Sequence, residues 1–177
     1  MRCLQRSGYS GATMIRIAKE AGVTTGALQH HFADRRDLML SVVREGYERL
    51  AAEVNGRLPH GGTLEERVDG AIDAMLAGYA TAPAMAAYEI AFAMRDDEEF
   101  ARQNLAIAAP SSAKLDQRWH ELFSDVATSD DAKRTARRVV RSCVLGLLGS
   151  RATGLAMVDQ DTVRGLKESV LHLLSPH

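Results

Sequence analysis

Polar side chains suited to contacting DNA bases cluster in one short segment near the start of the chain. They are Thr24, Thr25, Gln29 and His30, and they directly follow the sequence Ala21-Gly22-Val23. A glutamine can form two hydrogen bonds to an adenine edge, and a threonine hydroxyl can form a hydrogen bond to a donor or an acceptor on a base edge. Arg35 and Arg36 come next, and arginine binds backbone phosphates whatever the base sequence. The segment therefore has the residue types that sequence-specific DNA contact requires.

Two short helices joined by a tight turn must position these side chains. Thr13 is placed to cap a helix that runs to Glu20, and Gly22 can end it because glycine easily takes the left-handed conformation. Thr24 or Thr25 caps the next helix, which ends near His31. The residues that we expect to turn inward and lock the two helices are Ile15, Ile17, Ala18, Val23 and Leu28. This layout predicts a helix-turn-helix.

The composition is that of a globular helical protein. The 177-residue chain is 46% hydrophobic, 25% charged and 5% aromatic, and it is rich in Ala, Leu, Arg and Glu, which favours helices over sheets. Residues 1–50 hold eight Lys and Arg against five Asp and Glu, a net charge of +3, whereas the rest carries −4 within an overall −1. This asymmetry suits a small DNA-facing module on a neutral-to-acidic body.

Capping and breaking residues predict further helices almost to the end of the chain. We expect breaks at Asn55-Gly56 and at 58–62, then a capping box at Thr63 to Glu66. Pro83 separates the next two helices, Asp96 or Asp97 caps the one that follows, and Pro110 should kink or split it. Residues 129–131 cap a helix that runs to about Met157, and Asp159 caps the last helix. No β-hairpin signal appears, so the predicted fold is all-α.

Residues 8–50 resemble the DNA-binding domain of the TetR family of bacterial transcriptional regulators. The matching positions are Gly8-Tyr9, Ala12-Thr13, Ile17-Ala18, Ala21-Gly22-Val23, Gly26-Ala27-Leu28, His30-His31-Phe32 and Leu38. The resemblance implies a DNA-binding domain at 1–50 and a helical ligand-binding and dimerisation domain at 51–177. Its implied DNA contacts are Thr13, Thr24, Thr25, Gly26, Gln29, His30, His31 and Arg35, with Arg35 in the place of the family's usual phosphate-binding lysine.

Two departures from the family pattern stand out. Position 29 is usually tyrosine and is Gln29 here, which weakens a transferred phosphate contact and adds base readout. Before Gly8-Tyr9 the family has a longer first helix, whereas Met1–Ser7 precede it here, with Cys3 and Leu4 as the last inward residues of a shortened helix. Either the true start lies further upstream, or the DNA-binding domain is truncated. A missing first helix would strip apolar cover from Ile17, Leu28 and Phe32, and DNA binding would then be weak.

The middle of the chain has adaptable methionines and aromatic residues that suit a pocket for an apolar or aromatic effector. The residues that we assign to it are Met75, Tyr79, Met85, Tyr88, Phe92, Trp119 and Phe123. A stripe of this kind is also what an ordinary helical core contains, and for any single residue the core assignment is favoured. The grouping and the family resemblance favour the pocket.

The last two helices have apolar stripes, and the resemblance implies that they form a four-helix dimer interface. The residues assigned to it are Val140, Val144, Leu147, Leu148, Leu166, Val170 and Leu173. Glycines at 146, 149 and 154 interrupt the first of these helices and suggest close approach of another backbone. Packing within one chain is the alternative for the same residues.

The sequence contains no motif for catalysis or metal binding. Gly146 to Ser150 lacks the ending of a phosphate loop, His120-Glu121 is not followed by a second histidine, and Cys3 and Cys143 lack metal-ligand spacing. No apolar run could span a membrane, and no secretory signal is present. We therefore expect no cofactor, no enzyme activity and a cytoplasmic location.

Together these observations predict a ligand-responsive, homodimeric transcriptional regulator, most simply a repressor released from operator DNA by a small effector. The alternative is a small-molecule-binding helical protein that has lost DNA binding through truncation at its N-terminus.

Overall fold

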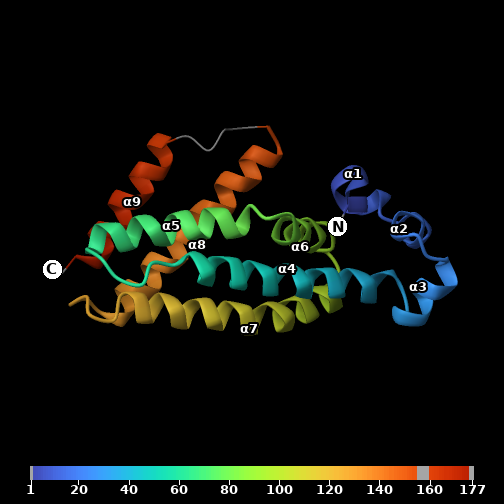
Figure 1. Cartoon of the computed structure of the whole chain (residues 1–177), viewed down its shortest axis with the longest axis horizontal. Coiled ribbons are helices and arrows are strands. Elements are labelled where there is room, and N and C mark those ends of the chain that lie inside the picture. Colours follow the sequence, from blue (N-terminus) through green and yellow to red (C-terminus); the bar gives the residue numbers. More distant parts are fainter. Residues whose placement is uncertain (1, 155–159, 176–177) are drawn as a thin grey trace. The chain divides into compact units, whose positions relative to one another are not determined.

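The computed structural model describes residues 2–154 and 160–175, and all regular structure within them is α-helical (Figure 1). In chain order the helices are α1 (Arg2–Gly11), α2 (Met14–Ala21), α3 (Thr25–His31), α4 (Arg35–Arg57), α5 (Leu64–Tyr79), α6 (Ala82–Ala93), α7 (Glu98–Leu122), α8 (Asp130–Ala152) and α9 (Gln160–Leu174). The all-α prediction is confirmed. In these two ranges no helix is both long and apolar enough to cross a bilayer.

The helices pack into two compact units. The first combines the residues up to Leu50 with Thr81–Ser111, and the second combines Ala51–Ala80 with the described residues from Ser112 onward. In the first unit α1 packs against α2 and α6; in the second, α5, α8 and α9 pack against one another. The functional boundary after residue 50 stays a prediction, because compact packing does not report which residues bind DNA.

Short-range capping signals identify most helix starts correctly. Thr63 and Glu66 form the predicted capping box: the Thr63 hydroxyl accepts from the Glu66 N–H at 3.2 Å, and the Glu66 carboxylate accepts from the Thr63 N–H at 2.9 Å. Asp97 caps α7 by accepting from the Phe100 N–H, and Ser129 caps α8 by accepting from the Ala132 N–H. These caps are local in sequence, which is why the pattern predicts them.

The predicted break at Asn55-Gly56 and the predicted split at Pro110 are wrong, and a kink at Pro110 stays a prediction. Helix α4 runs through Asn55-Gly56 and ends at Arg57, directly before Leu58, whose helical conformation is disfavoured by Pro59. Helix α7 is continuous through Pro110. Proline removes the hydrogen bond to the carbonyl four residues earlier, and that carbonyl belongs to Ala106, an exposed residue where water can bind it. Solvent therefore makes Pro110 tolerable.

The end of α8 lies earlier than predicted. The helix ends at Ala152 instead of running to Met157, and Gly154 follows with a left-handed φ of 72°. Met157 and the cap predicted at Asp159 both lie outside the described residues.

The helix-turn-helix keeps more apolar cover than expected. Cys3 and Leu4 of α1 are buried, as predicted. Leu28 is only 8% exposed, and Ile17 and Phe32 are half-buried, so the predicted loss of apolar cover is wrong for Leu28. The helix bends at Gly8, whose φ of 62° lies in the left-handed region.

One close approach in the first unit was not predicted. A Cβ atom at Gly46 of α4 would lie 2.5 Å from the Pro83 carbonyl oxygen and 2.7 Å from the Ala87 Cβ of α6. Only a residue without a side chain fits there, so Gly46 lets α6 lie directly against α4.

Candidate nucleic-acid interface

Helices α2 and α3 form a helix-turn-helix held by a small apolar core. Ala18 of α2, Leu28 of α3 and Leu38 of α4 are buried against one another. The half-buried residues that pack around this cluster are Met14, Ile17 and Phe32. The inward residues of three consecutive helices thus meet at one point, which sets the position of α3.

The turn between the helices depends on the conformation of Gly22. Its φ of 71° and ψ of 27° are left-handed, and the following Val23 N–H donates back to the Ala18 carbonyl at 3.0 Å. A Cβ at Gly22 would meet no atom within 4 Å. Glycine is therefore favoured here by backbone conformation and not by lack of space.

Two threonines fix the starts of the two helices. The Thr13 hydroxyl accepts from the Arg16 N–H at 3.3 Å, and the Thr24 hydroxyl accepts from the Ala27 N–H at 3.1 Å. Both caps agree with the sequence pattern. Each hydroxyl keeps its own proton, so Thr13 and Thr24 can still donate a hydrogen bond to a nucleic acid.

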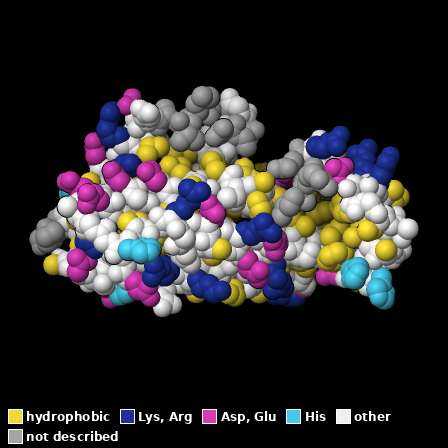
Figure 2. All heavy atoms as spheres, viewed as in Figure 1, with side chains coloured by type: hydrophobic (Ala, Val, Ile, Leu, Met, Phe, Trp, Pro, Cys, Tyr) yellow, Lys and Arg dark blue, Asp and Glu magenta, His cyan; other side chains and the backbone are white. Residues whose placement is uncertain are grey.

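The outer face of α3 presents the predicted base-contacting residues. Gly26, Gln29 and His30 have the spacing of a single helix face, and all three are exposed. Thr25 is half-buried, and His31 is exposed beside His30, with 5.6 Å between the ring centroids. Figure 2 shows histidine side chains at the surface over α3. The structure therefore places Gly26, Gln29 and His30 on one exposed face, and the role of the predicted set in binding DNA stays a prediction.

Two residues expected to lock the helices point outward instead. Ile15 is 70% exposed and Val23 is 45% exposed. Met14, Ile17 and Ala18 have the spacing of one helix face and turn toward the core, which puts Ile15 on another side of α2. The sequence pattern allowed more than one inward face on so short a helix.

Two cations on α2 were not singled out from the sequence. Arg16 and Lys19 are exposed on the helix that precedes the turn. Arg16 also donates to the Gly11 carbonyl at 3.4 Å. The sequence gives the positive charge of residues 1–50 as a total, and it contains no signal that says which of these cations lie on the surface.

Arg35, predicted to bind a phosphate, is occupied within the protein. Its Nε donates to the Ala12 carbonyl at 3.1 Å and its Nη2 donates to the Tyr9 carbonyl at 2.5 Å. The guanidinium also lies 4.0 Å from the centroid of the Tyr9 ring. Arg35 therefore fastens the end of α1 to the start of α4, and its contact with DNA stays a prediction.

The residues assigned to an effector pocket fall in both units. Met75, Tyr79, Trp119 and Phe123 are buried in the second unit, with the Trp119 and Phe123 ring centroids 4.8 Å apart. Met85, Tyr88 and Phe92 lie on α6 in the first unit. Phe92 is 72% exposed under the guanidinium of Arg95. The effector assignment stays a prediction.

The buried aromatic residues of the second unit border a very small void. Its volume is about 10 Å³, and its lining consists of Val54, Leu58, Met75, Leu115, Trp119 and Arg137. This is too small for any organic molecule, so a ligand at this position would have to displace side chains.

A more open cavity of about 540 Å³ lies elsewhere in the second unit. Its lining consists of Leu58, Pro59, His60, Gly61, Gly62, Arg67, Arg118, Glu121, Leu122 and Asp125. The guanidinium of Arg118 lowers the pKa of Glu121, and that of Arg67 lowers the pKa of Asp125, so both carboxylates are ionised at neutral pH. None of the predicted effector residues lines this cavity.

Most residues assigned to the dimer interface are buried within the single chain. Val140, Val144 and Leu148 of α8 have little surface left for a partner, and neither do Leu166 and Val170 of α9. Leu147 and Leu173 are half-buried. These side chains pack the second unit itself, and the outward faces of α8 and α9 contain other residues. The interface stays a prediction.

Within residues 2–154 and 160–175, no group of three His, Cys, Asp or Glu side chains is placed to hold a metal ion.

The packed core and the exposed face of α3 define a helix-turn-helix protein. The sequence model described as bacterial regulatory proteins of the tetR family matches residues 1–42. The HTH-type transcriptional repressor Rv1474c of Mycobacterium tuberculosis is 30% identical over 155 residues, which cover 86% of this chain and 78% of that protein. The chain belongs to the TetR family of bacterial transcriptional regulators.

Two further proteins resemble this chain. The HTH-type transcriptional repressor AcnR of Corynebacterium glutamicum is 41% identical over 54 residues, which cover 30% of this chain and 29% of AcnR. A solved transcriptional regulator from Rhodococcus sp. RHA1 has a TM-score of 0.72 at 17% identity and covers 98% of this chain and 90% of its own. That structural likeness shows the same fold over 98% of this chain.

The position of Arg35 leads to a first prediction. Replacing it in Arg35→Gln removes two charge-assisted hydrogen bonds to backbone carbonyls, and the free energy of unfolding should fall by about 1.5–3 kcal/mol. The matched control is Arg44→Gln, because Arg44 is exposed on the same helix. Urea unfolding measures both variants. Equal stabilities would show that Arg35 does not fasten α1.

Proposed function

We propose that this protein is a transcriptional repressor that binds operator DNA as a homodimer through α2 and α3. TetR-family regulators bind operator DNA, and two relatives reported above are named as repressors. A small apolar or aromatic effector would lower the operator affinity. Such control is a coupling free energy between two sites.

The observation that carries the DNA-binding proposal is the surface of α3. Gln29 and His30 are exposed side by side, while Leu28 anchors the opposite side of the helix in the core. A recognition helix needs this combination, because base contacts require side chains that reach out from a backbone held in place. Arg16 and Lys19 on α2 are exposed cations suited to phosphates.

The test is binding to the DNA upstream of the protein's own gene. An electrophoretic shift should be seen with the wild-type chain, and Gln29→Ala should weaken it by about 1–3 kcal/mol because a base contact is lost. The control is Gln117→Ala, since Gln117 is an exposed glutamine of the second unit. A reporter under the same promoter should increase when the protein is absent.

Failure of the wild-type chain to shift this DNA would favour the alternative, a helical protein that binds small molecules without reading DNA. A reporter that decreases when the protein is absent would identify an activator.

The effector is proposed to bind at the buried aromatic residues of the second unit. Met75 and Trp119 border the same void, and methionine side chains rearrange readily to admit a ligand. A non-polar ligand that opened this void would contact aromatic surface already excluded from water. The lining is apolar except for Arg137, whose guanidinium is paired with Asp116, and its apolar part supports an effector of the same character.

Trp119 makes this proposal measurable, because it is the single tryptophan of the chain. The dye 1-anilinonaphthalene-8-sulfonate, used as an aromatic probe, should accept excitation energy from Trp119 and should release the operator. Met75→Leu should change the affinity for the dye, whereas Phe92→Leu, at an exposed site, should not. Dye binding that depends on Phe92 and not on Met75 would place the site on the surface instead.

The homodimer is proposed to form on the outward faces of α8 and α9. Gly146 and Gly149 of α8 and Gly165 of α9 are exposed, and a Cβ at any of them would meet no atom within 4 Å. Glycine inside a helix costs about 0.5–1 kcal/mol relative to alanine. No described residue of the chain requires glycine at these positions, which supports close packing against a second copy.

Light scattering tests the proposed dimer. The wild-type chain should have the mass of a dimer at micromolar concentration, and Gly146→Glu should shift it toward the monomer because a charged side chain would be buried between two helices. Gly56→Glu is the control at another helical glycine that has open space around it. A wild-type monomer would overturn the proposal and leave no means of holding two recognition helices about 34–36 Å apart.

A further inference from the structure

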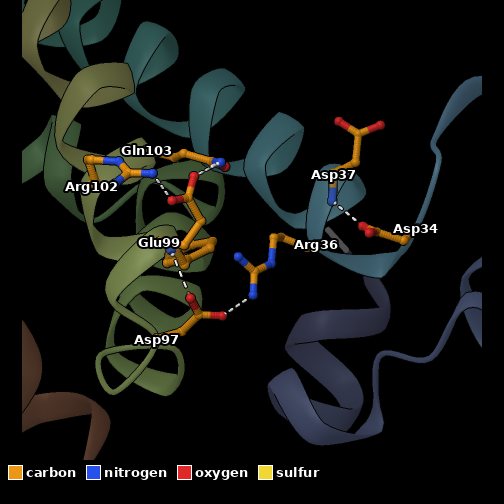
Figure 3. Close-up of polar contacts among 8 residues, drawn as sticks. Asp34, Arg36, Asp37, Asp97, Glu99, Arg102 and Gln103 are labelled. Carbon is orange, nitrogen blue, oxygen red and sulfur yellow. Dashed lines mark hydrogen bonds and ion pairs between the residues drawn. The ribbon is translucent and has the colours of Figure 1, made fainter.

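The first turn of α4 contains an ion pair that the DNA-binding proposal does not use. The Arg36 Nη2 donates to the Asp97 Oδ2, which joins α4 to the start of α7 within the first unit (Figure 3). Arg36 was considered from the sequence as a phosphate contact, by its position beside Arg35. In the structure its guanidinium turns toward Asp97 instead.

Asp97 is held firmly by its own backbone contacts. Its Oδ1 accepts from the Phe100 N–H at 3.0 Å, and its own N–H donates to the Met94 carbonyl at 3.1 Å. Phe100, one turn further on, is fully buried. Because the carboxylate is already in place as the helix cap, forming the pair costs little further side-chain freedom of Asp97, and the main ordering cost is that of Arg36.

Neighbouring acidic side chains have other partners. Glu99 accepts from Arg102 and Gln103 along α7, and Figure 3 shows its side chain turned toward them. Asp34 accepts from the Asp37 N–H at 2.9 Å and Asp37 accepts from the Ala33 N–H at 3.1 Å, so both cap the start of α4. The local hydrogen bonding thus leaves Arg36 directed at Asp97.

Arg36 is joined to the recognition helix by a short path. Leu38, two residues later, packs on Leu28 of α3, and Arg35 fastens the same turn of α4 to α1. A shift of this turn therefore moves α3. The side chains of Arg36 and Asp97 are 38% and 28% exposed, which makes this pair more sheltered than the neighbouring Arg95–Asp96 pair, where Asp96 is 86% exposed.

We propose that the Arg36–Asp97 ion pair is a positioning contact that sets the orientation of the recognition helix against the α6–α7 junction. Operator affinity then depends on the pair although neither residue contacts DNA. The inference rests on the proposed DNA-binding function and names two residues that control it. The rival arrangement is that Arg36 binds a phosphate and Asp97 competes with that phosphate.

Asp97→Asn separates these two arrangements. Asparagine caps a helix as well as aspartate does, so α7 keeps its start while the ion pair is lost. The control is Asp96→Asn, which removes the same charge one residue away at an exposed position. In the electrophoretic shift assay, Asp97→Asn should lower the affinity roughly fivefold or more relative to Asp96→Asn, with an unchanged salt dependence.

A second background shows whether the pair itself is responsible. In the chain with Arg36→Gln, adding Asp97→Asn should cause no further loss, because the contact is already absent. If Asp97→Asn raises the affinity and steepens the salt dependence, Arg36 is a phosphate ligand and the inference is wrong. Equal affinities of Asp97→Asn and Asp96→Asn also overturn it.

Failure of the proposed function is recognised separately. If the wild-type chain binds no upstream DNA, the proposed function fails, and the positioning contact is judged from amide hydrogen exchange. Asp97→Asn should then speed exchange in α3 and in the first turn of α4, whereas Asp96→Asn should not. Equal exchange in the two variants overturns the inference.

Discussion

The contact of Leu28 with Ala18 and Leu38 holds the helix-turn-helix together. Helices α2 and α3 have eight and seven residues, and isolated helices of this length are unstable in water. Their order comes from burying one face in a shared core, to which each helix contributes an inward residue. The exposed position of Gln29 and His30 depends on the same core, because Leu28 on the opposite side of α3 is held there.

At the start of α4, two arginines that the sequence suggested as phosphate ligands instead join segments of the chain. Arg35 donates to two carbonyls near the end of α1, and Arg36 pairs with the cap of α7. Both side chains were assigned to phosphates from their position in the sequence. Because guanidinium groups form several directed hydrogen bonds at once, they join chain segments as readily as they bind phosphates. By contrast, Arg16 and Lys19 on α2 are exposed.

The apolar stripes of α8 and α9 do not show by themselves whether their residues pack inside one chain or against a second copy. Val140, Val144 and Val170 pack the inside of the protomer. The outward faces instead contain glycines with open space around them. An apolar stripe in a sequence shows that a helix face is buried, but it does not show whether the covering surface belongs to the same chain.

Signals confined to a few neighbouring residues were predictable from the amino-acid sequence. The caps at Thr13, Thr24 and Thr63, the left-handed turn at Gly22 and the all-helical fold depend on hydrogen bonds or backbone preferences within about one helical turn. The resemblance of residues 8–50 to the TetR family rests on the same short motifs.

Features that depend on distant partners became visible only in the folded chain. Arg36 pairs with a carboxylate 61 positions later, and Gly46 lies against the backbone of Pro83. Neither contact can be predicted from the residues next to it in the sequence. The sequence predicts Ile15 as a core residue, whereas in the structure another face of α2 packs into the core. Local chemistry determines which helices form, whereas tertiary packing determines which of their side chains remain exposed at the surface.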